Sequence, residues 1–232
     1  MISKIIKTRD VLEFFVFSWG DLACLVPFGP TSMRVFCYNR KVLLKISKNE
    51  VTDLRVVAGE FGGRPLKTLE GKTTRPTTDK VKGAIFNMIG PFFDGGRVLD
   101  LFSGSGSLAI EAISRGMSSA VLVEKDRRAQ AVIQENIKMT KSEKQFQLLK
   151  MDAARALTQL TGKFDLVLLD PPYAKEQIVA NITQLEEQGL LAEEVMLVCE
   201  TDKAVDLPEE ISNFGIWKQK TYGISKVTVY VR

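Results

Sequence analysis

The stretch VLDLFSGSGSLAIE, residues 98–111, contains three local patterns in direct succession. Its apolar start predicts a strand over 97–102. Gly104 and Gly106 follow in the spacing G-x-G-x-x-A, and the helical periodicity of 107–116 begins immediately after them. Small residues let a backbone turn sharply and approach a ligand at the carboxyl end of a strand, although a plain tight turn is the alternative. Strand, turn and helix together predict the first unit of an α/β sheet.

Strand-like and helix-like segments continue to alternate to the end of the chain. The apolar runs are nearly continuous, which is typical of strands buried on both faces of a parallel sheet. No helix separates the last two strands, around FGIWKQKTYG and SKVTVYVR, so we expect an antiparallel hairpin there. We predict an α/β, Rossmann-like, doubly wound and mostly parallel seven-stranded sheet with this C-terminal hairpin. The other predicted strands are 97–102, 120–125, 145–152, 164–170 and 194–200, and the helices are 107–116, 126–140, 153–160 and 176–189.

The composition limits the chemistry. The 232-residue chain contains no histidine, which excludes His-based triads, His general bases and most zinc sites, so we predict no metal. Its three cysteines form no C-x-x-C pair, which favours a reducing cytoplasm over a disulfide framework. Glu13 and Asp21 interrupt the apolar segment near the start, so we expect no membrane span, a signal peptide being the alternative. The formal charge of +4 permits a polyanionic partner.

The chain changes character before the α/β region. Residues 1–53 show no clean periodicity. Residues 54–92 combine glycine-rich β-like pieces with a capped helix over 75–90. The interval 54–97 holds eight Lys or Arg against four Asp or Glu. We therefore predict an extension at 1–53, a basic β/α segment at 54–92 and the main α/β domain at 93–232.

Acids beside the glycine turn indicate what the turn binds. Glu124 ends the second strand, twenty residues after Gly104, where a carboxylate can accept both hydroxyl protons of a ribose. A solvated strand-end acid is the alternative. This spacing fits both NAD and S-adenosylmethionine, but Asp100 would repel a pyrophosphate at the mouth of the turn and would suit a cationic ligand. Asp152 ends the third strand and can bind the amine of adenine, or else cap the helix that follows.

The segment FDLVLLDPPYAK, residues 164–175, places an acid, two prolines and an aromatic ring at the end of the fourth strand. Asp170 and the carbonyl of Pro171 can each accept one N–H of a planar amino group and so aim the nitrogen lone pair at an electrophile. Pro172 stiffens this frame, and Tyr173 offers a face on which a base can stack. Methyl transfer to such an amine needs positioning rather than a strong base. The alternative is a simple strand-end turn.

These stretches, together with GEFGGRPLKTLEGKTTRPTTDKVKGAIFNMI at 59–89, resemble the RsmD-type 16S rRNA guanine-N2 methyltransferases of bacteria. The resemblance extends from about residue 54 to the end. Its most discriminating part is RPTTDKVKGAIFN, because many methyltransferases share the glycine loop and the DPPY motif. It implies the class I methyltransferase fold and S-adenosylmethionine as cofactor.

The resemblance also implies roles for individual residues. The catalytic motif would be Asp170, Pro171, Pro172 and Tyr173. Residues expected to contact the cofactor are Thr77, Asp100, Phe102, Ser103, Gly104, Gly106, Glu124, Lys125, Asp152 and Ala153. Residues expected to contact RNA are Arg55, Arg64, Lys67, Arg75 and Lys80. The family more often has alanine in place of Ser103 and Ser107, and because all these side chains are small we expect no change of function.

Residues 1–53 have no counterpart in the family, and Leu54 stands where its members usually begin with methionine. We expect these residues to be a mis-assigned or disordered extension, with Leu54 read from a non-AUG start codon. The alternative is an accessory RNA-binding arm.

The function expected from this resemblance is methylation of the exocyclic N2 amine of a guanine in 16S rRNA, within a 30S subunit or an assembly intermediate, by a cytoplasmic monomer. An adenine-N6 DNA or RNA methyltransferase is the nearest alternative, since DPPY serves there too. An NAD-dependent oxidoreductase would leave Asp100 and DPPY unexplained. A non-catalytic RNA-binding module with the same fold is the remaining alternative.

Overall fold

The computed structural model describes residues 54–69, 79–171 and 174–232, with backbone alone for 174–176 and, between residues 1 and 53, the backbone of six short strands. The chain divides into two compact units, residues 1–52 and 53–232. The first contains an antiparallel pair of strands and an antiparallel sheet in the order β3-β4-β5-β6. None of these strands was predicted, because the segment lacks a clean periodicity. They are β1 (Ile6–Thr8), β2 (Val11–Glu13), β3 (Phe15–Ser18), β4 (Asp21–Pro27), β5 (Ser32–Cys37) and β6 (Ile46–Ser47).

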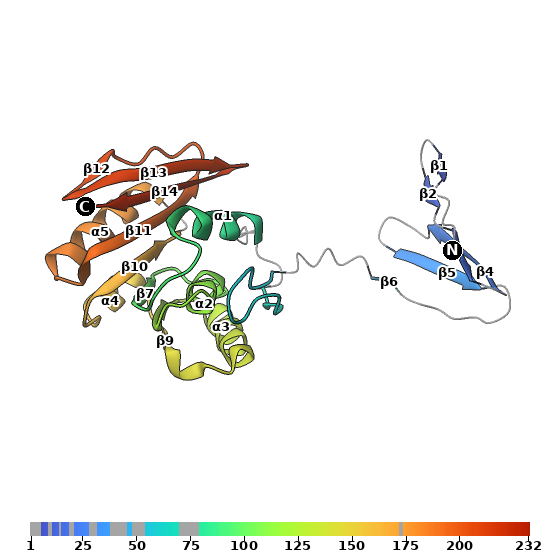
Figure 1. Ribbon diagram of the computed structural model, residues 1–232, viewed down its shortest axis with the longest axis horizontal. Helices are drawn as coiled ribbons and strands as arrows, with labels where there is room; N and C mark the ends of the chain where they lie inside the picture. Colours follow the sequence, from blue (N-terminus) through green and yellow to red (C-terminus); the bar gives the residue numbers. More distant parts are fainter. Residues whose placement is uncertain are drawn as a thin grey trace. The chain divides into compact units, whose positions relative to one another are not determined.

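The larger unit is built on an eight-stranded sheet in the order β12-β13-β14-β11-β10-β7-β8-β9 (Figure 1). The run from β11 to β9 is parallel, and β14 and β13 form the predicted antiparallel hairpin. All seven predicted strands are present, and the two-residue β12 at the edge is an unpredicted eighth. The strands are β7 (Arg97–Asp100), β8 (Ser119–Val123), β9 (Phe146–Leu149), β10 (Phe164–Leu169), β11 (Leu191–Asp202), β12 (Glu210–Ile211), β13 (Phe214–Tyr222) and β14 (Ser225–Val231).

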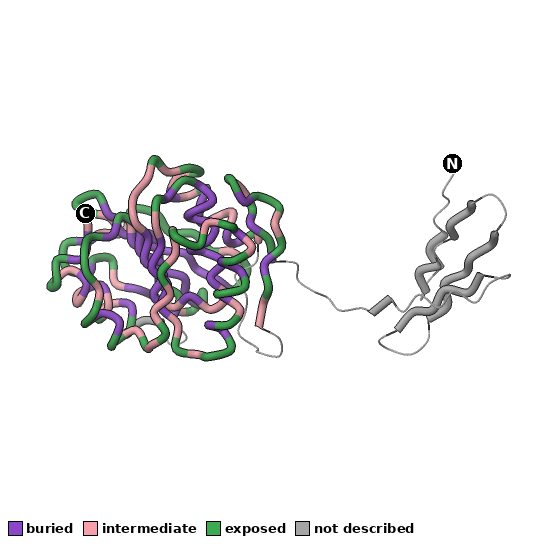
Figure 2. Tube along the Cα trace, turned by 90° about the horizontal axis from the view of Figure 1, so that it is seen from below, coloured by how far each residue is buried: buried purple, intermediate pink, exposed green. Residues whose placement is uncertain are grey.

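Helices cover both faces of this sheet, as the predicted doubly wound fold requires. The buried side chains form two clusters, one between the sheet and α1, α2 and α3, the other between the sheet and α4 and α5. The central strands are buried along most of their length (Figure 2). The helices are α1 (Asp79–Ile89), α2 (Ser107–Ser114), α3 (Arg127–Thr140), α4 (Ala153–Leu157) and α5 (Ala174–Glu187), with a short 3₁₀ turn at Glu143–Gln145. No helix in the described part of the chain is long and apolar enough to cross a membrane.

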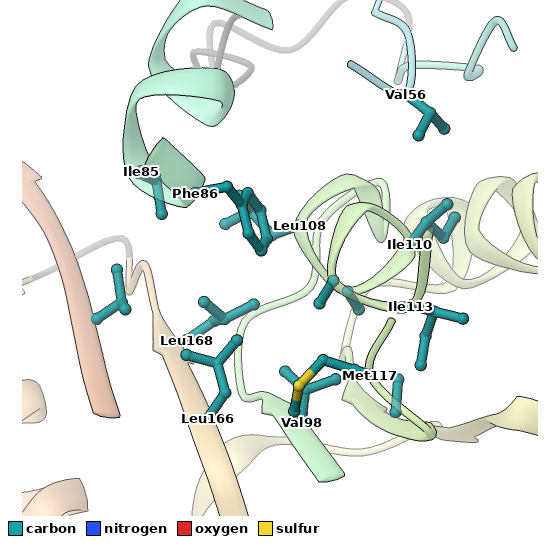
Figure 3. Close-up of a cluster of buried hydrophobic side chains, with 14 of the residues drawn as sticks. Val56, Ile85, Phe86, Val98, Leu108, Ile110, Ile113, Met117, Leu166 and Leu168 are labelled. Carbon is teal, nitrogen blue, oxygen red and sulfur yellow. The ribbon is translucent and has the colours of Figure 1, made fainter. Parts of the chain in front are cut away.

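Alternation along β10 shows how the sheet divides the core. Leu166 and Leu168 belong to the cluster under α1 and α2, whereas Val167 and Leu169 belong to the cluster under α5. Figure 3 shows Ile85 and Phe86 of α1 on the same side of the sheet as Leu166 and Leu168. Ile85 and Phe86 are fully buried, and burying a side chain of this size contributes about 1.5–3 kcal/mol. This packing fixes α1 above the strand that precedes the DPPY motif.

A buried carboxylate fastens residues 54–69 to α2. Glu111 is fully buried, and its carboxylate accepts hydrogen bonds from the backbone N–H groups of Val57 (2.7 Å) and Ala58 (3.0 Å). It also accepts a bond of 2.7 Å from Nε of Arg115, four residues along the same helix. These bonds compensate the desolvation of the charge, which would otherwise be costly. The upstream segment is therefore an integral part of the larger unit.

A buried lysine joins α1 to the same network. Lys82 is fully buried, with its Nζ 3.6 Å from Glu111 and 3.7 Å from Asp79, and it donates a hydrogen bond to the carbonyl of Arg55. Burial lowers the pKa of Lys82, and the charges of Glu111 and Asp79 act in the opposite direction. The network fixes the start of α1. Residues 70–78, which precede α1, lie outside the described residues.

Candidate active site at the carboxyl edge of the sheet

The strand register brings the predicted acids to one edge of the sheet. Asp100, the last residue of β7, pairs with Leu122 of β8 on one side and with Leu168 of β10 on the other. Glu124 and Asp170 each lie two residues beyond these partners. Both therefore lie just past the carboxyl edge of the sheet, on either side of Asp100. The strand order reverses at this place, since the chain continues to β8 on one side and later to β10 on the other. Such a switch point is where open α/β sheets bind ligands.

The glycine turn after β7 adopts a conformation that favours glycine. Gly104 and Gly106 have φ values of +55° and +76°. A Cβ added to Gly106 would lie 3.1 Å from a methyl group of Leu122, so this glycine permits close helix–strand packing. A Cβ on Gly104 would meet no atom of the described residues within 4 Å. Ser103 is buried, and its hydroxyl donates to the carbonyl of Asp100 over 2.8 Å. The hydrogen bond of Ser103 thus holds the start of the turn, and the described residues leave space beside Gly104.

Glu124 is held firmly beside this turn. One carboxylate oxygen accepts the backbone N–H of Gly104 over 2.9 Å, and the other accepts the N–H of Asp126 over 2.8 Å. Its own carbonyl accepts a bond from the side chain of Gln130 over 2.8 Å. A carboxylate has about four acceptor positions, so each oxygen can still accept a hydroxyl. The arrangement fits the predicted ribose contact and also shows that Glu124 orients the glycine turn.

Asp100 is the most strained charge at this edge. Its residue is 3% exposed, and Oδ2 has no hydrogen-bond partner within the part of the chain that the structure describes. Burial raises the pKa of Asp100 to about 7, and the nearby charge of Glu124 adds to this rise. Hydrogen bonds from the backbone of Ala109 and Phe102 lower the pKa and so act against this rise. A buried oxygen without a partner is a natural contact for a cationic group entering the site.

The two predicted contacts at the adenine side have different surroundings. Asp152 caps α4, because Oδ1 accepts the backbone N–H of Arg155 over 2.9 Å. The helix-cap alternative is therefore the one that the structure contains, and an adenine contact stays a prediction for the rest of this carboxylate. Ala153 is the first residue of α4 and is partly exposed. Lys125 is exposed, and Phe102 is half-buried against the core under α4 and α5.

Asn136 of α3 connects the glycine turn to the upstream segment. Its Oδ1 accepts the backbone N–H of Lys67 over 2.8 Å. Its Nδ2 donates to the carbonyl of Lys67 (3.0 Å) and to the carbonyl of Ser105 (2.9 Å), between the two glycines. Only 2% of the residue is exposed. One side chain therefore holds two segments that are far apart in sequence.

Replacing Asn136 with alanine should lower the free energy of unfolding by about 2–4 kcal/mol, because it leaves three polar backbone groups without their partner. Chemical denaturation of the purified variant measures this. Gln134→Ala is the matched control, because Gln134 is an exposed residue of the same helix. Equal stability of the two variants would contradict the structural role of Asn136.

The catalytic motif is described only in part. Asp170 is exposed and Pro171 is buried at the end of β10, whereas Pro172 and Tyr173 lie outside the described residues, as do Arg75 and Thr77. The buried ring of Pro171 anchors the backbone that follows Asp170. The structure therefore supports the placement of Asp170 at the switch point, and the roles of all six residues stay predictions.

The predicted RNA contacts separate into two kinds. The guanidinium of Arg64 donates to the carbonyls of Met139 (3.2 Å) and Thr140 (3.0 Å), the last residues of α3, and stacks over Phe61. Its structural use is thus to cap a helix end, which sequence alone did not reveal. Lys67 is exposed and forms an ion pair with Glu135, while Arg55 and Lys80 are exposed. For these three, contact with RNA stays a prediction.

Glu200 is a site residue that the sequence analysis did not select. It follows Cys199, which pairs with Leu169 of β10, so Glu200 is next in register to Asp170. The residue is 7% exposed, and Oε1 accepts a hydrogen bond of 2.6 Å from the hydroxyl of Ser225. The signal was present, because an acid ended the predicted strand 194–200 just as acids ended the four strands before it.

Comparison with known proteins places the chain among relatives. The family model described as Conserved hypothetical protein 95 matches residues 54–231. The chain belongs to this family. The putative rRNA methyltransferase YlbH of Bacillus subtilis (strain 168) is 43% identical over 180 residues, covering 76% of this chain and 98% of the relative. The ribosomal RNA small subunit methyltransferase D of Escherichia coli (strain K12) is 30% identical over 179 residues, covering 77% and 90%.

A solved structure supports the same assignment. A conserved hypothetical protein of Streptococcus pyogenes shares 72% sequence identity with a TM-score of 0.64, covering 66% of this chain and 95% of its own. The predicted membership of the RsmD-type family is confirmed, and so is the predicted α/β fold with its C-terminal hairpin. In this family member, the matched region contains the glycine turn and every acid at the carboxyl edge, whereas residues 1–53 lie outside the match.

Proposed function

We propose that this family member is an S-adenosylmethionine-dependent rRNA methyltransferase that acts on the exocyclic N2 amine of a guanine in the small ribosomal subunit. The observation that carries the proposal is the position of Asp170 and Pro171 at the switch point, directly beside the glycine turn. The names of its relatives support an rRNA substrate. The resemblance of the RPTTDKVKGAIFN block supports guanine.

The residues at the edge fit the proposed cofactor. Asp100 offers to the cationic methionine part a buried oxygen that has no hydrogen-bond partner among the described residues. Glu124, already oriented by two backbone N–H groups, offers acceptors to the ribose hydroxyls. The open space above Gly104 leaves room for the backbone to be approached. When bound, the cofactor would supply an electrophilic methyl group on a positively charged sulfur.

The catalytic motif would orient the amine rather than activate it by a base. Asp170 and the carbonyl of Pro171 would each accept one N–H of the guanine amine, leaving the lone pair directed at the methyl group. The amine would take up the methyl group as the bond between methyl and sulfur breaks, and it would then release a proton to water. The positive charge on sulfur is neutralised in this step, so the reaction needs no histidine. Orientation of this kind can contribute about 7–11 kcal/mol.

The substrate base must leave its stack to reach this edge, so the proposal implies base flipping or an open loop. Tyr173 would hold the base by stacking. Arg55, Lys67, Arg75 and Lys80 would contact phosphates around the site. Because the formal charge is only +4, we propose that an assembled 30S particle helps to position a monomeric enzyme.

The purified protein should transfer labelled methyl from S-adenosylmethionine to 30S particles from cells that lack its gene. Nuclease digestion and nucleoside analysis should locate the label in N2-methylguanosine of 16S rRNA. Free 16S rRNA, 50S particles and duplex DNA serve as comparison substrates. Labelling of adenine would instead favour the N6-methyltransferase alternative, and binding of NAD with no affinity for S-adenosylmethionine would favour the oxidoreductase.

A further inference from the structure

Two acids, Glu200 on β11 and Asp170 directly after the end of β10, lie where the substrate base would enter. Leu169 of β10 pairs with Cys199 of β11, so Asp170 and Glu200 are the next pair in this parallel register, about 5 Å apart along the sheet. Leu168 and Val198 belong to the core under α1 and α2, and the following pair, Leu169 and Cys199, to the opposite core. By alternation, Glu200 lies on the face of α1 and α2, like its ladder partner Val227, and Asp170 directly follows the end of β10 beside it.

We propose that Glu200 determines substrate specificity by accepting the N1–H of guanine while Asp170 and Pro171 hold the neighbouring amine. This inference rests on the function proposed above and names the residue that separates guanine from adenine. The Watson–Crick edge of guanine presents N1–H and the 2-amino group side by side, both as donors. Adenine presents an acceptor nitrogen next to its amine. A carboxylate would bind the first edge and repel the second.

The surroundings of Glu200 suit this role because they hold its carboxylate in place and shield it from water. Glu200 is 7% exposed, and Ser225 beside it is 1% exposed. The hydroxyl of Ser225, at the start of β14, holds Oε1 over 2.6 Å. Val227, which pairs with Glu200 in the antiparallel ladder, is fully buried. A hydrogen bond to a carboxylate in a largely water-free position discriminates strongly, because a base with an acceptor at N1 would place that acceptor against the carboxylate instead of donating to it.

The exposed end of the hairpin lies beside the same strand end. Ser225 pairs with Asp202, and the N–H of Lys203 donates to the carbonyl of Ile224 over 2.8 Å. Ile224 is 53% exposed. The hairpin turn thus holds the end of β11. Through the hydrogen bond from Ser225, it also holds the Glu200 carboxylate in position. Ser225 acts as a positioning residue.

The test uses two bases that share the 2-amino group. Guanine has an N1–H, whereas 2-aminopurine has an acceptor at N1. Once the target nucleotide has been located in 30S particles, particles are reconstituted with either base at that position. The ratio of kcat/KM for guanine over 2-aminopurine should be about 10⁴–10⁵ for the wild-type protein, as for sites built to bind a substrate N–H.

Glu200→Gln should reduce this ratio at least tenfold, because the amide can donate to the acceptor nitrogen of 2-aminopurine. Ser225→Ala should reduce it less, because the carboxylate stays in place but loses its brace. Glu210→Gln is the control, since Glu210 is an exposed glutamate of β12, and should keep the wild-type ratio. Cofactor affinity and thermal unfolding show whether each variant is folded, and Ser225→Ala decides the matter if Glu200→Gln does not fold.

A ratio near one for the wild-type protein, or a ratio unchanged in both Glu200→Gln and Ser225→Ala, would overturn the assignment of Glu200 even if overall activity falls. Methylation of guanine would still stand in that case. If the wild-type protein methylates no guanine in the 30S particle, the proposed function itself fails, and this inference fails with it.

Discussion

Replacing Asp170 with alanine is expected to reduce the rate of methyl transfer to 30S particles by about 10²–10⁴-fold, while the Kd for S-adenosylmethionine changes by no more than a few-fold. The carboxylate would contact the substrate amine and not the cofactor, so its loss removes the orientation of the lone pair at the reacting centre. Losing one such preorganised polar contact typically costs this much in rate. Single-turnover transfer of labelled methyl and calorimetric titration with the cofactor measure the two effects separately.

Asp94→Ala is the matched control, because Asp94 is an exposed aspartate in the loop before β7. It should keep the wild-type rate. Near-normal turnover of the Asp170 variant would reject Asp170 as the acceptor of the amine. A parallel loss of cofactor affinity and thermal stability would instead assign it a structural role.

Replacing Asp100 with asparagine should have two opposite effects. The cofactor-free protein should gain about 1–3 kcal/mol in free energy of unfolding at pH 8, because a buried charge with an unpartnered oxygen is removed. The Kd for S-adenosylmethionine should rise by about 30-fold or more, because the cationic methionine part loses its counter-charge. A functional site that is costly to the empty protein is a common compromise between stability and activity.

The pH dependence of stability gives an independent check on Asp100. Its pKa is raised from 3.8 to about 7 in the folded protein. Between these values the folded state binds more protons than the unfolded state, so this group makes stability fall as pH rises. Between pH 5 and pH 8 the free energy of unfolding of the wild-type protein should fall by about 2–3 kcal/mol relative to that of Asp100→Asn. Denaturant unfolding at both pH values measures this, and parallel curves for the two proteins would contradict it.

The pH dependence of cofactor affinity should also reflect the titration of Asp100. A cation beside Asp100 favours its charged form, so binding releases a proton, and the affinity of the wild-type protein should increase about tenfold between pH 6 and pH 8. The Asp100→Asn variant should show no such increase.

The order of the helices and strands could be predicted because nearly every buried strand is an apolar run that ends at turn residues or at the cap of the next helix. The strand bounds and the edge strand that the prediction missed depend on pairing with strands elsewhere in the chain. Strand β11 runs from Leu191 to Asp202, beyond the predicted 194–200, because β10 pairs with it at Leu191 and β14 pairs with it as far as Asp202. The two-residue β12 exists only through its pairing with β13.

The candidate site was predictable to the extent that function requires a residue at the end of a strand. Asp100, Glu124 and Asp170 were found in this way. The residues that support them were missed, because their partners are distant in sequence. Asn136 binds Lys67 across 69 positions, and Glu200, although it ends a predicted strand, is held by Ser225, 25 positions later. A polar residue within a helix or strand gives no sign of such a partner.

The central claim is tested most directly by nucleoside analysis of 16S rRNA from cells lacking the gene. We predict that one N2-methylguanosine is missing, and that a plasmid copy of the wild-type gene restores it whereas a copy encoding Asp170→Ala does not. An unchanged set of modified nucleosides in the 16S rRNA, or the loss of an N6-methyladenosine in its place, would contradict the account.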